Sequence, residues 1–217
     1  MTGALLCVAA TASAQQKPRE TEMAKPEAGE ERMGEMHGMP AHRMEPVAPA
    51  EVDRIIAGWL AKPQQVARQL ISQYGQPQEA TAMRLVWHGN GPWKRTVLVN
   101  QEIPHNFPIP HPDMLEQVID YRVPPEKFDE LAAYDGSVIV ERTKGEISAR
   151  CDKEMANFLA LNLANDIVEG EKSVDEARRF YAEAVIQKKH PEYMKGLVFQ
   201  PATAKAGDPD ESSPLAR

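Results

Sequence analysis

The stretch from Met33 to Met44, which reads MGEMHGMPAHRM, contains the residues best suited to binding a soft metal ion. Thioether sulfur and imidazole nitrogen suit Cu(I), and a flexible chain can wrap around one ion without a preformed site. The stretch is therefore a candidate Cu(I) site, and the alternative is a low-complexity arm whose methionines are incidental. The candidate ligands are Met33, Met36, His37, Met39, His42 and Met44.

Cys151 is the other candidate for chemistry, because its thiol is predicted to lie between a strand and a helix. Asp152 is the predicted N-cap, and a helix N-terminus beside the cations Arg150 and Lys153 could lower the pKa of a thiol. Folding would have to supply a base from His88, His105 or His111. No local signature of a cysteine enzyme surrounds Cys151, and lone cysteines are commonly small buried hydrophobic residues. We therefore predict an inert thiol.

The segment PHNFPIPHPD contains a second histidine pair, His105 and His111. Its four prolines favour polyproline II, which rises about 3.1 Å per residue and would separate the two rings by about 19 Å. One metal ion cannot bridge that distance unless a tight turn intervenes. We therefore interpret the segment as a rigid crossover loop or a surface that faces a partner.

The N-terminal residues 1–14 are predicted to be a signal peptide. They form a short apolar run that ends in Ala12-Ser13-Ala14, the small residues that signal peptidase requires, which makes Gln15 the expected mature start. An ordinary N-terminal helix is the alternative. No other run approaches the about 18 apolar residues of a transmembrane helix. We expect an exported protein that is periplasmic or secreted.

Composition divides the remaining chain into two tails and one domain. Residues 15–49 and 199–217 are poor in aromatic residues and rich in Pro, Gly and charge, which predicts disorder because such segments cannot bury enough apolar surface. A single domain over residues 50–198 remains. The net charge of −7 does not favour binding to nucleic acid.

Periodic patterns within this domain predict an α+β fold. Two apolar stripes with helical spacing come first, followed by a hairpin around GNGP, a strand over residues 115–123 and a second hairpin around Gly145. Two helices end the domain, the second opened by a capping box at Ser173 and Glu176. We expect an antiparallel sheet of about five strands with helices packed on one face.

Two features of the expected elements could serve binding. Trp93 follows the GNGP turn, where it could be an exposed contact residue. Asn157, Asn162 and Asn165 recur on the most apolar helix, where buried amides need partners. We expect the asparagines to hydrogen-bond to the sheet; lining a polar groove is the alternative.

Three stretches carry a resemblance to known proteins. YGQPQEATAMRLVWHGNGPWKR, PHNFPIPHPDMLEQVIDYRVP and YDGSVIVERTKGEISARCDKEMANFLALNLAND resemble an uncharacterised family of exported bacterial proteins, over most of residues 62–187. That family has no established activity. A shorter stretch, Tyr74-Gly75-x-Pro77 with Leu85-x-Trp87, resembles outer-membrane assembly lipoproteins of the SmpA/OmlA type over about twenty residues.

Taken together, the sequence favours a non-catalytic binding or interaction module of the cell envelope. Its Met/His arm is expected to bind Cu(I), and its partner is an unidentified envelope protein. The rival hypothesis is a thiol-dependent enzyme that uses Cys151, and the third is a purely structural envelope protein.

Overall fold

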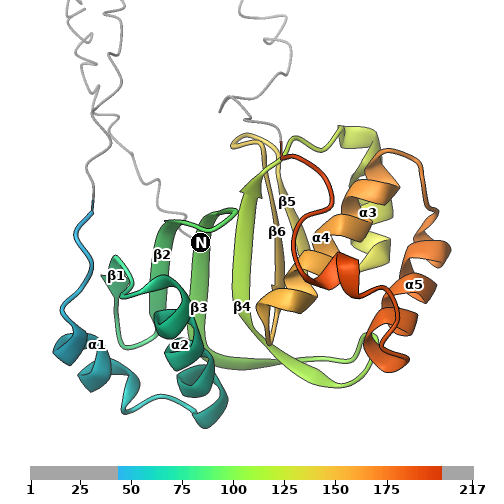
Figure 1. Cartoon of the computed structure of the whole chain (residues 1–217). Helices are drawn as coiled ribbons and strands as arrows, with labels where there is room; N and C mark the ends of the chain where they lie inside the picture. The colour runs from blue at the N-terminus through green and yellow to red at the C-terminus, as the bar shows by residue number, and fades with distance from the viewer. Residues whose placement is uncertain (1–43, 202–217) are drawn as a thin grey trace, which may run out of the picture. The chain divides into compact units, whose positions relative to one another are not determined.

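Six strands form one antiparallel sheet in the computed structural model, which describes residues 44–201 (Figure 1). The predicted α+β class is confirmed, with one strand more than expected because the two-residue β1 pairs with β2. The spatial order is β1-β2-β3-β4-β6-β5. The strands are β1 Glu79–Ala80, β2 Arg84–Asn90, β3 Trp93–His105, β4 His111–Asp120, β5 Val138–Glu141 and β6 Glu146–Cys151.

Five α-helices and two short 3₁₀ helices accompany this sheet in the described residues. The capping box is confirmed at α5, where Ser173 and Glu176 exchange side-chain and backbone hydrogen bonds. The predicted N-cap at Asp152 is wrong, because α4 is preceded by Lys153, which makes no side-chain capping bond. The helices are α1 Pro49–Ile56, α2 Ala61–Tyr74, η1 Pro125–Lys127, α3 Phe128–Tyr134, α4 Glu154–Val168, α5 Val174–Ile186 and η2 Pro191–Met194.

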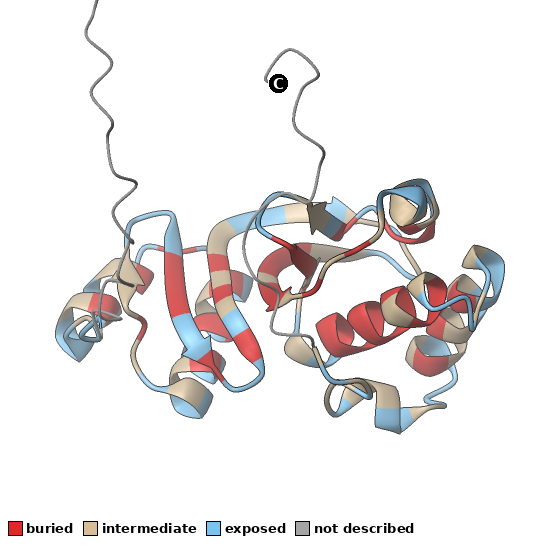
Figure 2. Ribbon diagram, turned by 90° about the horizontal axis from the view of Figure 1, so that it is seen from above, coloured by how far each residue is buried: buried red, intermediate tan, exposed pale blue. Residues whose placement is uncertain are grey.

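The helices cover one face of the sheet, as expected from the order of strands and helices along the chain. Leu98 lies opposite Leu115 across β3 and β4, and Ile119 shares their face because it follows Leu115 by four residues. Leu98 and Leu115 belong to the apolar cluster under α1 and α2, whereas Ile119 belongs to the cluster under α3, α4 and α5. Two adjacent cores therefore lie on the same side of the sheet, and Figure 2 shows their buried residues in red.

Glu154, in the first turn of α4, joins these two cores. Its carboxylate accepts hydrogen bonds from Tyr74 Oη at 2.5 Å, Trp93 Nε1 at 2.6 Å and Gln117 Nε2 at 3.0 Å. Burial opposes its ionisation, but these donors hold the pKa of the Glu154 carboxyl below its usual range. The prediction that Trp93 is exposed is wrong: the ring is 1% exposed and stacks on Phe158.

The three asparagines of α4 have structural partners, but only one of them binds the sheet. Asn157 Nδ2 donates to the carbonyl of Leu115 and to Gln117 Oε1, both in β4. Asn162 instead binds backbone groups of η2 and of the segment that follows it, and Asn165 Oδ1 accepts from Tyr121. Within residues 44–201, no helix has the length and apolar character needed to cross a bilayer.

Candidate functional site

The hairpin between β3 and β4 brings His105 and His111 together. β3 ends at His105, β4 begins at His111, and the two residues lie directly opposite each other in the register. Their ring centroids are 4.9 Å apart. The expectation of an extended segment is therefore wrong: the chain reverses over residues 106–110, where the Phe107–Pro108 peptide bond is cis. The pairing of β3 with β4 outweighs the preference of the prolines for an extended polyproline II conformation.

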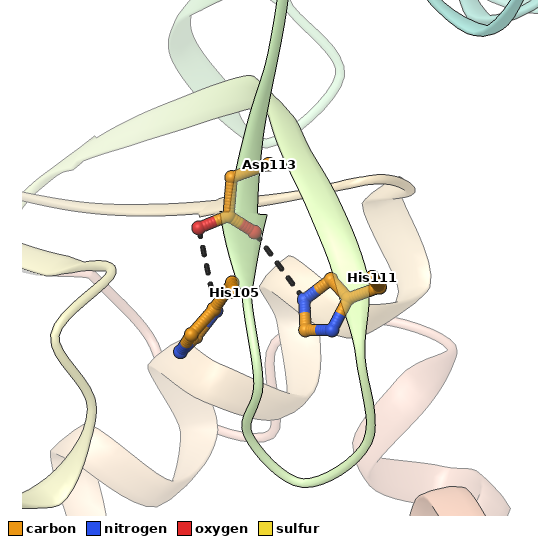
Figure 3. A group of neighbouring side chains, drawn as sticks. All are labelled: His105, His111 and Asp113. Atoms are coloured by element: carbon orange, nitrogen blue, oxygen red, sulfur yellow. Dashed lines mark ion pairs between the residues drawn. The ribbon is translucent and has the colours of Figure 1, made fainter.

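Asp113 completes the group, because it follows His111 by two residues and so shares its face of β4. Its Oδ2 lies 3.3 Å from His105 Nδ1, and its Oδ1 lies 3.3 Å from His111 Nε2. Figure 3 shows the carboxylate of Asp113 facing both rings. The side chain of Asp113 is 4% exposed, and those of His105 and His111 are 19% and 13% exposed. The three side chains form a largely dehydrated cluster.

Three atoms of this cluster make no hydrogen bond, and the contacts among their residues are ion pairs at 3.3 Å. The three atoms are His105 Nδ1, His111 Nε2 and Asp113 Oδ1, all buried. Each of the three residues can offer one ligand atom such that all three atoms lie within 4.8 Å of one another. Without a metal ion the two ion pairs hold the cluster together, but buried polar atoms usually form hydrogen bonds as well, so the convergence of these three atoms also suits a bound ion.

The opposite sides of both rings face further oxygen atoms. His111 Nδ1 lies 2.8 Å from the carbonyl oxygen of Ile109 and can donate a hydrogen bond to it. In a neutral ring this donation would leave Nε2 free to bind a metal ion. His105 Nε2 lies 3.6 Å from Oδ1 of Asp135, which follows α3. Asp135 is itself fixed by the backbone N–H and hydroxyl of Ser137. The contact of His111 is typical of metal-binding histidines, whereas the distance from His105 to Asp135 is too long for a hydrogen bond.

The electrostatics of the cluster favour a positive charge. The interaction with Asp113 is the main cause that raises the pKa of His111 to about 11, and Cys151 is a second cause. Burial lowers this pKa but is outweighed. At neutral pH the metal-free ring is therefore an imidazolium. A metal ion would have to displace this proton to reach Nε2.

Cys151, the last residue of β6, lies beside His111 but is not an activated thiol. Burial is the main cause that raises the pKa of Cys151 above its usual value, against the influence of His111. The side chain is 5% exposed, and its Sγ lies 3.6 Å from Asp152 Oδ1. The expectation of a lowered thiol pKa is thus wrong, because burial and the carboxylate of Asp152 outweigh the groups that favour the thiolate, His111 among them.

The other candidate residues from the sequence lie elsewhere. Of the proposed Cu(I) ligands, Met44 is described and is 46% exposed. His88, a candidate base for Cys151, is instead paired with Glu79 at 2.8 Å. The remaining Cu(I) candidates, which are Met33, Met36, His37, Met39 and His42, lie outside the described residues.

Sequence reasoning missed Asp113 and Asp135 as members of the site. The spacing of His111 and Asp113 was a usable signal, because residues two apart on a strand share a face. The alternating pattern predicts a strand that begins at residue 115, whereas β4 begins at His111, so the pattern alone does not place His111 and Asp113 on one strand. Asp135 gave no such signal, since it is brought in from a distant helix.

The comparisons with known proteins found no matching family model, no matching curated protein and no matching solved structure. The resemblance to exported bacterial proteins therefore stays a prediction.

Proposed function

We propose that this protein is an exported binding module that holds one divalent transition-metal ion at His105, His111 and Asp113. The observation that carries the proposal is the convergence of three buried ligand atoms without hydrogen-bond partners. Metal binding would replace the two ion pairs by bonds from one atom of each residue to a single ion.

Two imidazole nitrogens and a carboxylate favour zinc or another divalent first-row metal, and not the harder ions Mg²⁺ and Ca²⁺. In a tetrahedral zinc site with bonds of about 2.0–2.1 Å, neighbouring ligand atoms lie about 3.3–3.4 Å apart. The two histidine–Asp113 distances of 3.3 Å involve different carboxylate oxygens, and one ligand atom from each residue gives separations of up to 4.8 Å, so the side chains would have to move closer together to bind zinc. Three protein ligands leave one position open for water or a small ligand. We therefore choose Zn²⁺ as the first metal to test.

This site is chemically distinct from the Cu(I) site proposed for the Met/His arm. The arm offers thioether sulfur, which prefers Cu(I), whereas the hairpin cluster offers nitrogen and oxygen. The two proposals therefore predict selectivity for different metals. A thiol-dependent enzyme is less well supported, since the Cys151 thiol is buried and its pKa is raised.

Thermal unfolding of the full chain with and without Zn²⁺ tests the proposal. Zinc at about 100 times its dissociation constant should stabilise the protein by about 2.7 kcal/mol, which raises the midpoint by about 5–10 °C. His105→Asn and Asp113→Asn should fold without metal and lose this shift. His88→Asn is the matched control, because it removes a histidine that lies 2.8 Å from a carboxylate outside the cluster. An equal zinc shift in all four proteins, or none in wild type, would refute the site.

A further inference from the structure

A pocket that we call the lysine-lined pocket lies between the start of α4, the end of α5 and η2. Its volume is about 260 Å³, and its apolar wall comes from both sides of the α4–α5 pair. The apolar residues that line it are Met155, Ala156, Ala184, Val185, Pro191 and Met194. This space could accept an aliphatic chain.

Four lysines complete the lining, which is unusual for a chain with a net charge of −7: Lys153, Lys188, Lys189 and Lys195. Two of them have carboxylate neighbours, since Lys153 lies 3.5 Å from Asp152 and Lys189 lies 3.4 Å from Glu183. Among the described residues, Lys188 and Lys195 have no ion-pair partner within 4.0 Å. The pocket therefore combines an apolar wall with uncompensated positive charge.

The backbone holds one of these lysines in an unfavourable conformation. Lys188 has φ 59° and His190 has φ 55°, both in the left-handed region that non-glycine residues rarely adopt. The ring of His190 stacks on Phe180 with centroids 3.9 Å apart, which fixes this short loop against α5. Lys188 follows the C-cap of α5, where a left-handed residue commonly ends a helix, so this helix ending fixes the position of Lys188 at the pocket.

From these three observations we infer that the lysine-lined pocket binds a single-chain fatty acid. The aliphatic chain lies against the apolar wall, and the carboxylate lies between the ammonium groups of Lys188 and Lys195. The volume is below the range of about 300–1,000 Å³ that is typical of pockets for drug-sized ligands, which favours one unbranched chain over a two-chain lipid. The inference does not depend on the metal site.

Calorimetric titration of the full chain with dodecanoate, in EDTA and below the concentration at which the surfactant self-associates, tests the inference. Dodecanoate should bind, and dodecyltrimethylammonium, with the same chain and the opposite charge, should bind at least about 10-fold more weakly. Equal binding of both surfactants, or no binding of dodecanoate, would overturn the inference. Binding to phosphatidylglycerol vesicles without binding of free dodecanoate would also overturn the inference.

Two sets of variants assign any binding to this pocket. Lys188→Asn with Lys195→Gln should weaken dodecanoate binding about 3- to 10-fold, since Asn tolerates the left-handed conformation and both lysines are exposed. Met155→Glu should weaken it about 10-fold or more by placing a charge on the apolar wall. Met155→Leu and the distant Lys144→Gln are the matched controls. Unchanged affinity in the double lysine variant and in Met155→Glu would refute the assignment.

Discussion

Replacing Glu146 by Gln should lower stability at neutral pH but not in strong acid. The carboxylate of Glu146 at the start of β6 is 4% exposed and pairs with Arg95 at 2.6 Å and Lys94 at 2.9 Å. The hydrogen bond from Arg95 contributes most to lowering the pKa of Glu146 from 4.5 to about 2. The hydrogen bond from Lys94 lowers this pKa further. Glutamine keeps the shape and one acceptor oxygen while it removes the charge.

The magnitude follows from this pKa difference. Each tenfold change in proton affinity corresponds to about 1.4 kcal/mol, so a fall from 4.5 to about 2 contributes about 3 kcal/mol of stability. Because the folded-state pKa is the lower one, this contribution is present above pH 4.5 and is lost as the pH falls towards 2. About half should remain near pH 3.2, and about 0.5 kcal/mol or less at pH 2.

Urea unfolding followed by tryptophan fluorescence measures this difference, because Trp87 and Trp93 are buried. Wild type and Glu146→Gln should differ by about 2–3 kcal/mol at pH 7 and should converge between pH 4.5 and pH 2. Glu102→Gln, at an exposed residue of β3, is the control and should match wild type throughout. A difference between wild type and Glu146→Gln that stays constant from pH 7 to pH 2.5 would show that the ion pairs are not its source.

Three further predictions concern other parts of the chain. Glu154→Gln should destabilise the domain by about 1–3 kcal/mol, because it removes the charge that accepts hydrogen bonds from Tyr74 and Trp93, and urea unfolding at pH 7 measures the loss. Cys151 should react slowly with a thiol reagent at pH 7 and quickly in urea, and rapid labelling of the folded protein would instead support the enzyme hypothesis. Changing the four methionines of the 33–44 stretch to leucine should weaken Cu(I) binding in competition with a chelator and leave the thermal midpoint unchanged. Equal copper retention by wild type and this variant would identify the stretch as incidental low-complexity sequence.

The sequence by itself determined the elements whose signals are local. The capping box at Ser173 could be recognised because all of its groups lie within one turn of helix. The hairpin from β5 to β6 was predicted from two alternating runs around Gly145, which has φ 66° in the structure. The α+β class followed from the order of these patterns along the chain.

Only the tertiary structure decided the site, because its contacts depend on where the chain reverses and how strands pair. The prolines around His105 and His111 indicate extended backbone, yet ladder pairing on both sides of the turn places the two residues opposite each other. Asp135 reaches His105 from the end of α3, a contact that no periodicity encodes. Local sequence patterns indicate the backbone preference of a segment. The convergence of His105, His111 and Asp135 is instead fixed by strand register and helix packing, which are non-local.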